Sequence, residues 1–197
     1  TVQHEFTPKP LLGLAVRDRS CWRVGSGNTV SGVEPLLQAD YFCEFFRLAK
    51  EQHNHTTLDT AGQPFTTAEP FFSRLTTLLE HTDLVILDLK HIDPEKTRLL
   101  AVHSNESILS FARFVDQIHK PMWVRHVLVP GITDDPANLH GIRAFLDTLS
   151  NVEKVEILPY HTLGIYKWET LGIPYSLSDI RIPDENDLKR ANQILLG

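Results

Sequence analysis

The sequence predicts an α/β protein built as an open or partial (β/α) barrel with parallel strands. Two observations predict it: short apolar strands alternate with amphipathic helices, and polar residues follow the ends of several strands. Strands that are apolar throughout and lie between helices are typical of a parallel sheet covered on both faces. Five such strands are too few to close the usual barrel of eight, so an open arrangement is expected.

The regular pattern begins near residue 28, and each element follows from its own spacing. Residues 84–90 (LVILDLK) form a nearly continuous apolar run, which predicts a strand buried on both faces. Residues 105–118 repeat apolar side chains at helical spacing behind an asparagine that suits an N-cap. The same reasoning predicts strands at 28–31, 55–59, 122–129 and 155–159, helices at 40–50, 69–79, 136–149 and 184–196, and a long loop before the last helix.

Residues 25–197 are expected to form a single domain, preceded by an irregular N-terminal segment over residues 1–24. The chain has 197 residues, of which 42% are hydrophobic, and this is enough for one sizeable core. Residues 1–24 show no clean helical or strand period.

The composition argues against nucleic-acid binding and against a membrane span. The formal net charge is −6, and lysine and arginine are scattered rather than clustered. No apolar run approaches the roughly 20 residues that cross a bilayer, and the N-terminus lacks a signal-peptide pattern. The two cysteines, Cys21 and Cys43, are expected to be reduced thiols in a cytoplasmic protein.

Charged and polar residues gather at the carboxyl ends of the predicted strands, where parallel α/β barrels place their chemistry. They are Glu34, Asp59, Asp88, Lys90, Arg125, His126, Tyr160 and His161. Cations there would pair a carboxylate and acids an ammonium, so this rim suits a zwitterionic ligand. Structural alternatives stay open: the carboxylates could cap helices, Lys90 could be a solvated strand end, Arg125 could form an ion pair, and His161 could be structural.

Several collinear stretches within residues 25–197 carry a family resemblance. They are TVSGVEPLLQ, HTTLDTAG, TDLVILDLKHI, HSNESILSFARF, PMWVRHVLVPGITDD and NVEKVEILPYHTLGIYKWETLGIPY. In this order they resemble the activating enzymes of pyruvate formate-lyase, which are members of the radical SAM superfamily. The resemblance implies a partial (β/α) barrel of radical SAM type. It also implies reductive cleavage of S-adenosylmethionine (SAM) at a [4Fe–4S] cluster, followed by abstraction of a hydrogen from a glycine of pyruvate formate-lyase or another glycyl radical enzyme.

The resemblance also assigns roles to individual residues. The residues that match SAM-contacting positions are Gly32, Val33, Glu34, Asp88, Leu89, Lys90, Arg125 and His161. Asp59 and Asp88 match carboxylates that hold a monovalent cation beside the SAM carboxylate. Val33 replaces a family glycine, and a β-branched residue resists positive φ. The turn is therefore expected either to keep an extended backbone at this residue or to narrow the SAM pocket.

The N-terminal part departs from the family pattern. A first strand and a Cys-x3-Cys-x2-Cys loop should precede the SGxEP turn, whereas the sequence has two cysteines in total. Three thiolates hold such a cluster while SAM takes the fourth iron, so this chain contains no set of iron–sulfur ligands. We expect a truncated or degenerate member with its first strand missing or rewritten. Its open sheet edge should be covered by residues 1–24 or by another chain in an oligomer.

Two other functions stay open at this point. The chain could be a SAM-binding or partner-docking module without catalysis. It could also be an unrelated barrel lyase that uses Lys90 as a Schiff-base nucleophile. The affinity for SAM, the iron content and borohydride trapping of a carbonyl compound on Lys90 separate these functions.

Overall fold

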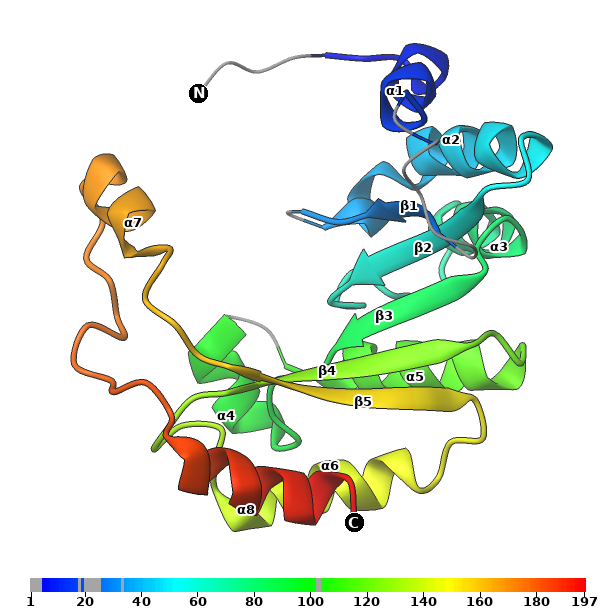
Figure 1. Ribbon diagram of the computed structural model, residues 1–197. Helices are drawn as coiled ribbons and strands as arrows, with labels where there is room; N and C mark the ends of the chain where they lie inside the picture. The colour runs from blue at the N-terminus through cyan, green and yellow to red at the C-terminus, as the bar shows by residue number, and fades with distance from the viewer. Residues whose placement is uncertain (1–4, 18, 20–25, 33, 102–103) are drawn as a thin grey trace. The chain divides into compact units, whose positions relative to one another are not determined.

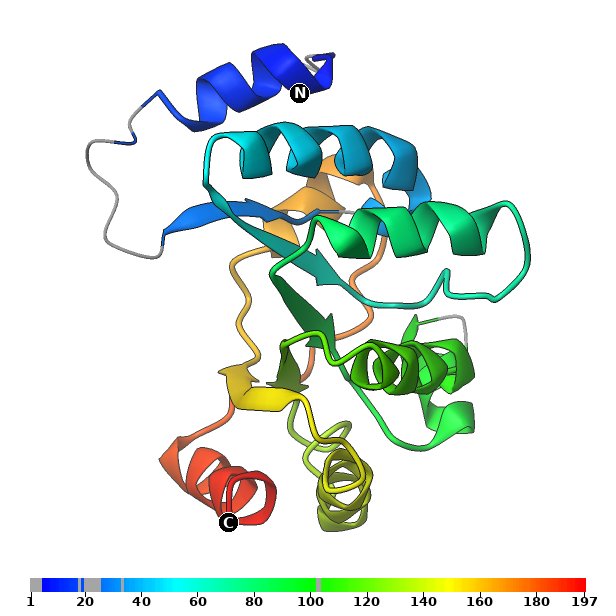
Figure 2. The same cartoon turned by 90° about the vertical axis from the view of Figure 1, so that its right-hand side faces the viewer.

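Figures 1 and 2 show the computed structural model, which describes residues 5–17, 19, 26–32, 34–101 and 104–197. The strands are β1 (Gly27–Val30), β2 (His55–Thr60), β3 (Leu84–Asp88), β4 (Met122–Leu128) and β5 (Val152–Pro159). The helices are α1 (Pro8–Ala15), α2 (Ala39–Glu51), α3 (Phe71–Glu80), α4 (Pro94–Ala101), α5 (Glu106–Gln117), α6 (Pro136–Leu146), α7 (Ile165–Leu171) and α8 (Glu185–Leu195), with a 3-10 turn η2 (Pro35–Gln38) before α2. In the described part of the chain, no helix is long and apolar enough to cross a membrane.

The strands form a sheet in the order β1-β2-β3-β4-β5, and the predicted parallel arrangement is confirmed. Strand β1 pairs with β2, and β2 with β3, both in parallel. Between β3 and β4, the amide of Val85 donates to the carbonyl of Pro121 and the amide of Leu89 to that of Arg125. Both partners advance in the same direction along their strands, which is the pattern of a parallel pair.

The chain divides into two compact units, each of which is discontinuous in sequence. Unit 1 contains Thr1–Leu87 and Glu106–Trp123, and unit 2 contains Asp88–Asn105 and Val124–Gly197. Strands β3 and β4 each contribute residues to both units. The expectation of a single domain over residues 25–197 stays a prediction.

Unit 1 has a core of aromatic and aliphatic side chains between its strands and its helices. Figures 1 and 2 show α2, α3 and α5 on the same face of β1–β3. Phe46 of α2 and Phe111 of α5 are fully buried. The Phe65 ring lies 5.7 Å from that of Phe111 and 5.5 Å from that of Phe114, centroid to centroid. Burial of such rings is the main source of stability in a core of this kind.

Helix α1 forms within the segment where the sequence showed no period. Pro8 occupies the first helical turn, where the missing amide hydrogen leaves no intrahelical bond unmade. Only Leu12 of this helix is buried, so an amphipathic stripe was hardly visible in the sequence. The helix contacts α2, and the Tyr41 hydroxyl of α2 donates to the carbonyl of Phe6. The expectation that residues 1–24 or another chain cover the sheet edge stays a prediction.

Helices α4 and α7 were also not predicted from the sequence, and α7 replaces part of the long loop expected before the last helix. Helix α7 has no buried residue, so its sequence needs no apolar stripe, and it ends at Gly172 in the left-handed conformation. Helix α6 ends at Leu146, three residues before its predicted end, because tighter backbone bonds from Thr148 to Phe145 and from Leu149 to Leu146 take over.

Helix α8, the last helix of unit 2, begins with a capping box. The Asp184 carboxylate accepts from the amides of Asn186 and Asp187, and the Asp184 amide in turn donates to the Asp187 carboxylate. The buried Asp187 also accepts from Arg181 and Arg190. The cap and the cationic partners fix the start of α8, whose other contacts are with α6 and β5.

Candidate functional site

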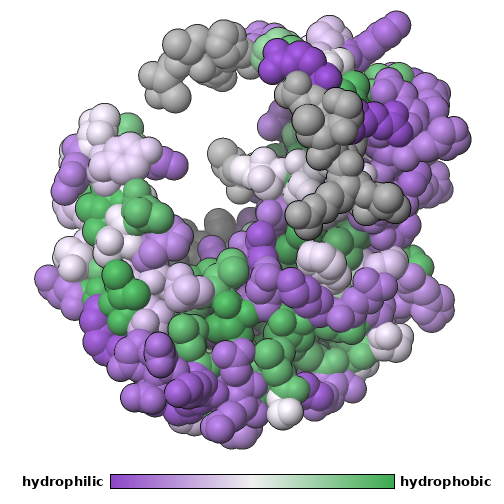
Figure 3. Space-filling view, in the orientation of Figure 1, coloured by the Kyte–Doolittle hydropathy of each residue, from purple (hydrophilic) through white to green (hydrophobic). Residues whose placement is uncertain are grey.

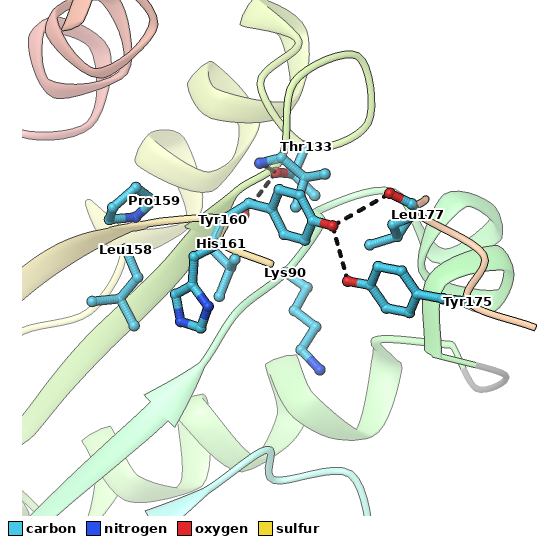
Figure 4. Close-up of a pocket in the computed structure, with 10 residues that line it drawn as sticks. Lys90, Thr133, Leu158, Pro159, Tyr160, His161, Tyr175 and Leu177 are labelled. Carbon is cyan, nitrogen blue, oxygen red and sulfur yellow. Dashed lines mark hydrogen bonds between the residues drawn. The ribbon is translucent and has the colours of Figure 1, made fainter. Parts of the chain in front are cut away.

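Unit 2 contains a pocket of about 500 Å³ at the carboxyl ends of β4 and β5 (Figure 4). Its lining residues are Lys90, Val127, Val129, Thr133, Leu158, Pro159, Tyr160, His161, Tyr175 and Leu177. Most of this lining is apolar, and the polar side chains come from the segments that follow β3, β4 and β5. Apolar walls with a few convergent polar groups are typical of a small-molecule site.

Lys90 and His161 are the two groups of this pocket that can meet a negatively charged ligand. Both are exposed, and Figure 4 shows the Lys90 side chain extending between His161 and Tyr175. Neither side chain makes a hydrogen bond or an ion pair with another residue in the described part of the chain. Their polar atoms are therefore available to a ligand, and Lys90 would supply a full positive charge.

A pair of tyrosines forms one wall of the pocket. The Tyr175 hydroxyl donates to the Tyr160 hydroxyl at 3.0 Å, and the Tyr160 hydroxyl donates to the Leu177 carbonyl at 3.3 Å. Burial, followed by the bond with Tyr160, raises the pKa of Tyr175 to about 12. Tyr175 therefore stays protonated at neutral pH, and the two bonds tie residues 175–177 to the end of β5.

Asp88 and Arg125 form an ion pair where β3 ends. The Arg125 Nε and Nη2 atoms lie 3.0 and 2.9 Å from Asp88 Oδ1, and both side chains are partly buried. Arg125 thus makes the ion pair that the sequence allowed as its structural role. The bond holds Asp88 directly before Leu89 and Lys90.

Glu34 lies in unit 1 and binds three protein donors. Its Oε1 atom accepts from the Leu36 amide at 3.0 Å and from the Thr60 hydroxyl at 2.6 Å, and Oε2 accepts from the Ala61 amide at 3.0 Å. The carboxylate therefore caps η2, as one sequence alternative had it. A carboxylate offers about four acceptor sites, so one remains for a ligand.

For the other predicted site residues, the structure gives only the backbone conformation or the burial. Gly32 has φ +108°, a conformation that favours glycine, whereas Val33 lies outside the described residues. Asp59 is partly buried near the end of β2. Sequence reasoning missed Thr60, which bonds Glu34, and Tyr175, which lies in the stretch expected to be a loop. The only sequence signal for Thr60 was its place directly after the strand predicted at 55–59, and the structure makes it the last residue of β2.

Comparisons with known proteins decide the family. Residues 16–140 match the model of the radical SAM superfamily. The pyruvate formate-lyase-activating enzyme of Listeria monocytogenes is 46% identical over 192 residues, which are 97% of this chain and 77% of the relative. That of Staphylococcus aureus is 47% identical over 167 residues, which are 85% of this chain and 66% of the relative.

The chain belongs to the pyruvate formate-lyase-activating enzyme family of the radical SAM superfamily. The family resemblance of the sequence is confirmed. It extends further toward the N-terminus than the expected start at residue 25, because the Listeria alignment covers 97% of this chain. A crystallised domain of pyruvate formate-lyase-activating enzyme from Bacteroides vulgatus is 24% identical with a TM-score of 0.70, covering 87% of this chain and 94% of that one. This likeness confirms the fold.

Radical SAM enzymes use SAM and a [4Fe–4S] cluster, and the two groups differ in how they suit this chain. In unit 2, the cation of Lys90 and the apolar pocket walls suit the carboxylate and the adenosyl group of SAM in kind. A cluster with an open iron takes three thiolates, whereas residues 1–197 contain two cysteines. Burial, and then Glu44, raises the pKa of the Cys43 thiol, and Cys21 lies outside the described residues. Residues 1–197 by themselves offer fewer thiols than such a cluster takes.

Two buried histidines of unit 2, His91 and His126, make the free energy of unfolding depend on pH. Desolvation lowers the pKa of His91 and of His126, which are 2% and 0% exposed. A histidine in the unfolded chain has a pKa of about 6.5, so below that pH the unfolded state binds more protons than the folded state. The free energy of unfolding therefore has its full value above about pH 6.5, and it decreases as the pH falls from there through the lowered pKa values of the folded state.

We therefore expect the free energy of unfolding to fall when the pH is lowered from about 7.5 to about 5. Urea unfolding at several pH values measures it, and His126→Asn should flatten the dependence by removing one of the two groups. The exposed His140 provides the control, because His140→Asn should leave the slope as it is. A slope that His126→Asn does not change would contradict the prediction.

Proposed function

We propose that this chain forms the SAM-binding part of a pyruvate formate-lyase-activating enzyme. The observation that carries the proposal is the pocket of unit 2, into which Lys90 and His161 bring polar atoms that have no partner among the described residues. Its apolar walls suit an adenosyl group, and Lys90 suits a carboxylate. An adenosyl group and a carboxylate are both parts of SAM. The family resemblance separately assigns Glu34 of unit 1 to the SAM ammonium, and its remaining acceptor site suits such a group.

A monovalent cation at Asp88 is part of the same proposal, whereas the same role for Asp59, which belongs to unit 1, stays an expectation from the family resemblance. Arg125 bonds Oδ1 of Asp88, and Oδ2 makes no hydrogen bond with the described residues. Asp88 is two residues before Lys90, so a cation bound to its carboxylate would lie near the lysine that we assign to the ligand carboxylate. The assignment rests on the family resemblance and on this open oxygen.

We also propose pyruvate formate-lyase as the protein partner, because the relatives are named for activating it. Unit 2 offers apolar surface that supports a protein partner. Leu163, Tyr166 and Leu171 are 77%, 61% and 71% exposed around α7, and Figure 3 shows hydrophobic atoms along the segment that follows this helix. Large exposed apolar side chains grouped on one segment are typical of interaction sites.

A cytoplasmic location stays a prediction.

Isothermal titration with SAM tests the proposal. Lys90→Ala is expected to weaken binding about tenfold or more, because it removes the charge that pairs the ligand carboxylate. His161→Ala should weaken it less. Lys189→Ala on α8 is the matched control, since it removes one exposed lysine of the same unit and should leave the affinity unchanged.

Absence of SAM binding by the unaltered chain would overturn the proposal, and equal affinities of Lys90→Ala and Lys189→Ala would overturn the pocket assignment. The same preparation, treated anaerobically with iron and sulfide, should retain no stoichiometric iron, because it offers two cysteines. A cluster signal that shifts on addition of SAM would show that ligands are shared between chains.

A further inference from the structure

The loop that follows β3, residues 89–93, is held at several of its peptide groups by buried polar side chains. The Leu89 carbonyl bonds the His126 Nδ1 atom at 2.9 Å, and the His91 carbonyl accepts from Asn105 at 2.9 Å. The Ile92 amide donates to Asn138 at 2.8 Å. His126, Asn105 and Asn138 are 0%, 1% and 2% exposed. All of these residues belong to unit 2.

Lys90 stands out within this fixed loop. It is exposed and lines the pocket, and its side chain makes no bond with the described residues. The Leu89 carbonyl before it and the His91 carbonyl after it are both held by hydrogen bonds, whereas the Lys90 side chain extends without a bond to the described residues. A loop that is ordered before the ligand arrives reduces the entropy that binding must spend on ordering it.

Strand β4 holds the loop from both of its faces through neighbouring residues. Successive side chains of a strand point to opposite faces, and Arg125 and His126 are accordingly half-buried and buried. Arg125 bonds the Asp88 carboxylate with its side chain and accepts the Leu89 amide with its carbonyl. His126 bonds the carbonyl of the same Leu89. The two residues thus fix Asp88 and both polar groups of Leu89.

The histidine is not explained by core packing alone. The Leu89 oxygen only accepts, so the His126 Nδ1 atom carries the proton; the backbone of Thr133 also lies against the ring, but among the described residues the buried Nε2 atom has no partner of good hydrogen-bond geometry. An unpaired buried nitrogen lowers stability, and an apolar side chain would avoid that cost. What a leucine could not supply is the hydrogen bond to the carbonyl next to Lys90.

We propose that His126 is a positioning residue of the SAM site: through its bond to the Leu89 carbonyl it fixes the loop that aims Lys90 into the pocket. The inference rests on the proposed function, since it concerns the same site. His126 does not touch the ligand in this assignment, and it acts through Lys90.

Hydrogen exchange of the unliganded protein tests the loop directly. His126→Leu should speed the exchange of the Leu89 and Ile92 amides, and it should weaken SAM binding by roughly three- to tenfold. His126→Asn places an amide N–H near the lost donor and should recover most of both effects. Leu146→Ala, which removes buried side-chain atoms at the far end of α6, controls for lost stability. It should lower the melting temperature without changing either readout.

Unchanged exchange of these amides in His126→Leu would overturn the inference, whatever happens to SAM. So would faster exchange with unchanged SAM affinity, provided that Lys90→Ala weakens binding. If the unaltered chain binds no SAM, the proposed function fails, and the exchange of the Leu89 amide still decides whether His126 holds the loop.

Discussion

Replacement of Gly62 by alanine is expected to lower the free energy of unfolding by about 2–5 kcal/mol. Gly62 has φ +68°, which strains any residue with a β-carbon. An added Cβ would also lie 2.8 Å from Phe111 Cδ1 and 3.1 Å from Leu87 Cδ1. Phe111 is fully buried and packed against Phe65, so its ring has no room to move away. Urea unfolding followed by circular dichroism measures the loss.

Gly172 provides a matched control for this change. Its φ is +67°, nearly the same as that of Gly62, but an added Cβ would meet nothing within 4 Å. Gly172→Ala should therefore cost only the backbone strain, about 1 kcal/mol. Equal losses in the two variants would mean that the overlap with Phe111 is relieved at no cost, and the packing argument would be wrong.

Replacement of Glu34 by alanine is expected to cost about 2–4 kcal/mol of stability and to weaken SAM binding as well. The change removes the cap of η2 and leaves the Thr60 hydroxyl and the Ala61 amide without their acceptor. Thr60 is 2% exposed, so water cannot readily replace the lost carboxylate oxygen. Chemical unfolding and titration with SAM measure the two effects on the same protein.

Two further variants sharpen this prediction. Glu34→Gln keeps one acceptor but turns an NH₂ group towards a donor, so its loss should lie between that of the unaltered chain and that of Glu34→Ala. Glu69→Ala removes an exposed carboxylate that accepts a single bond from the Ser73 amide, and it should cost well under half as much. A loss in Glu34→Ala no larger than in Glu69→Ala would contradict the prediction.

The elements that could be predicted are those whose sequence pattern reflects burial. The apolar residues 84–87 reflect the burial of Leu84, Val85 and Leu87 in β3, although Ile86 is only half-buried, and α5 has a clear period because four of its residues face the core of unit 1. Helix α7 buries none of its residues and α1 buries one, so neither had a stripe to read. In these two cases the helix forms without the pattern by which helices are recognised.

The same distinction applies to the site. Lys90 and His161 lie two residues beyond the ends of β3 and β5, so the rule that parallel strands end at one edge located them. The bond between Glu34 and Thr60 depends on the register in which Val30 of β1 lies opposite Leu58 of β2, which one strand cannot reveal. Tyr175 lies beyond α7 in a stretch without a period. Its contact with Tyr160 depends on the path of the chain after α7 and not on local spacing.

The discontinuity of the two units has a consequence for synthesis on the ribosome. Phe65 and Phe72 emerge early, but the rings that cover them, Phe111 and Phe114, follow only after residues 88–105 of the other unit. Because chains emerge from the N-terminus at a limited rate, the nascent chain presents uncovered aromatic surface during this interval. That interval is when a chaperone would find a binding site, and two nascent chains on one message could meet through the same rings.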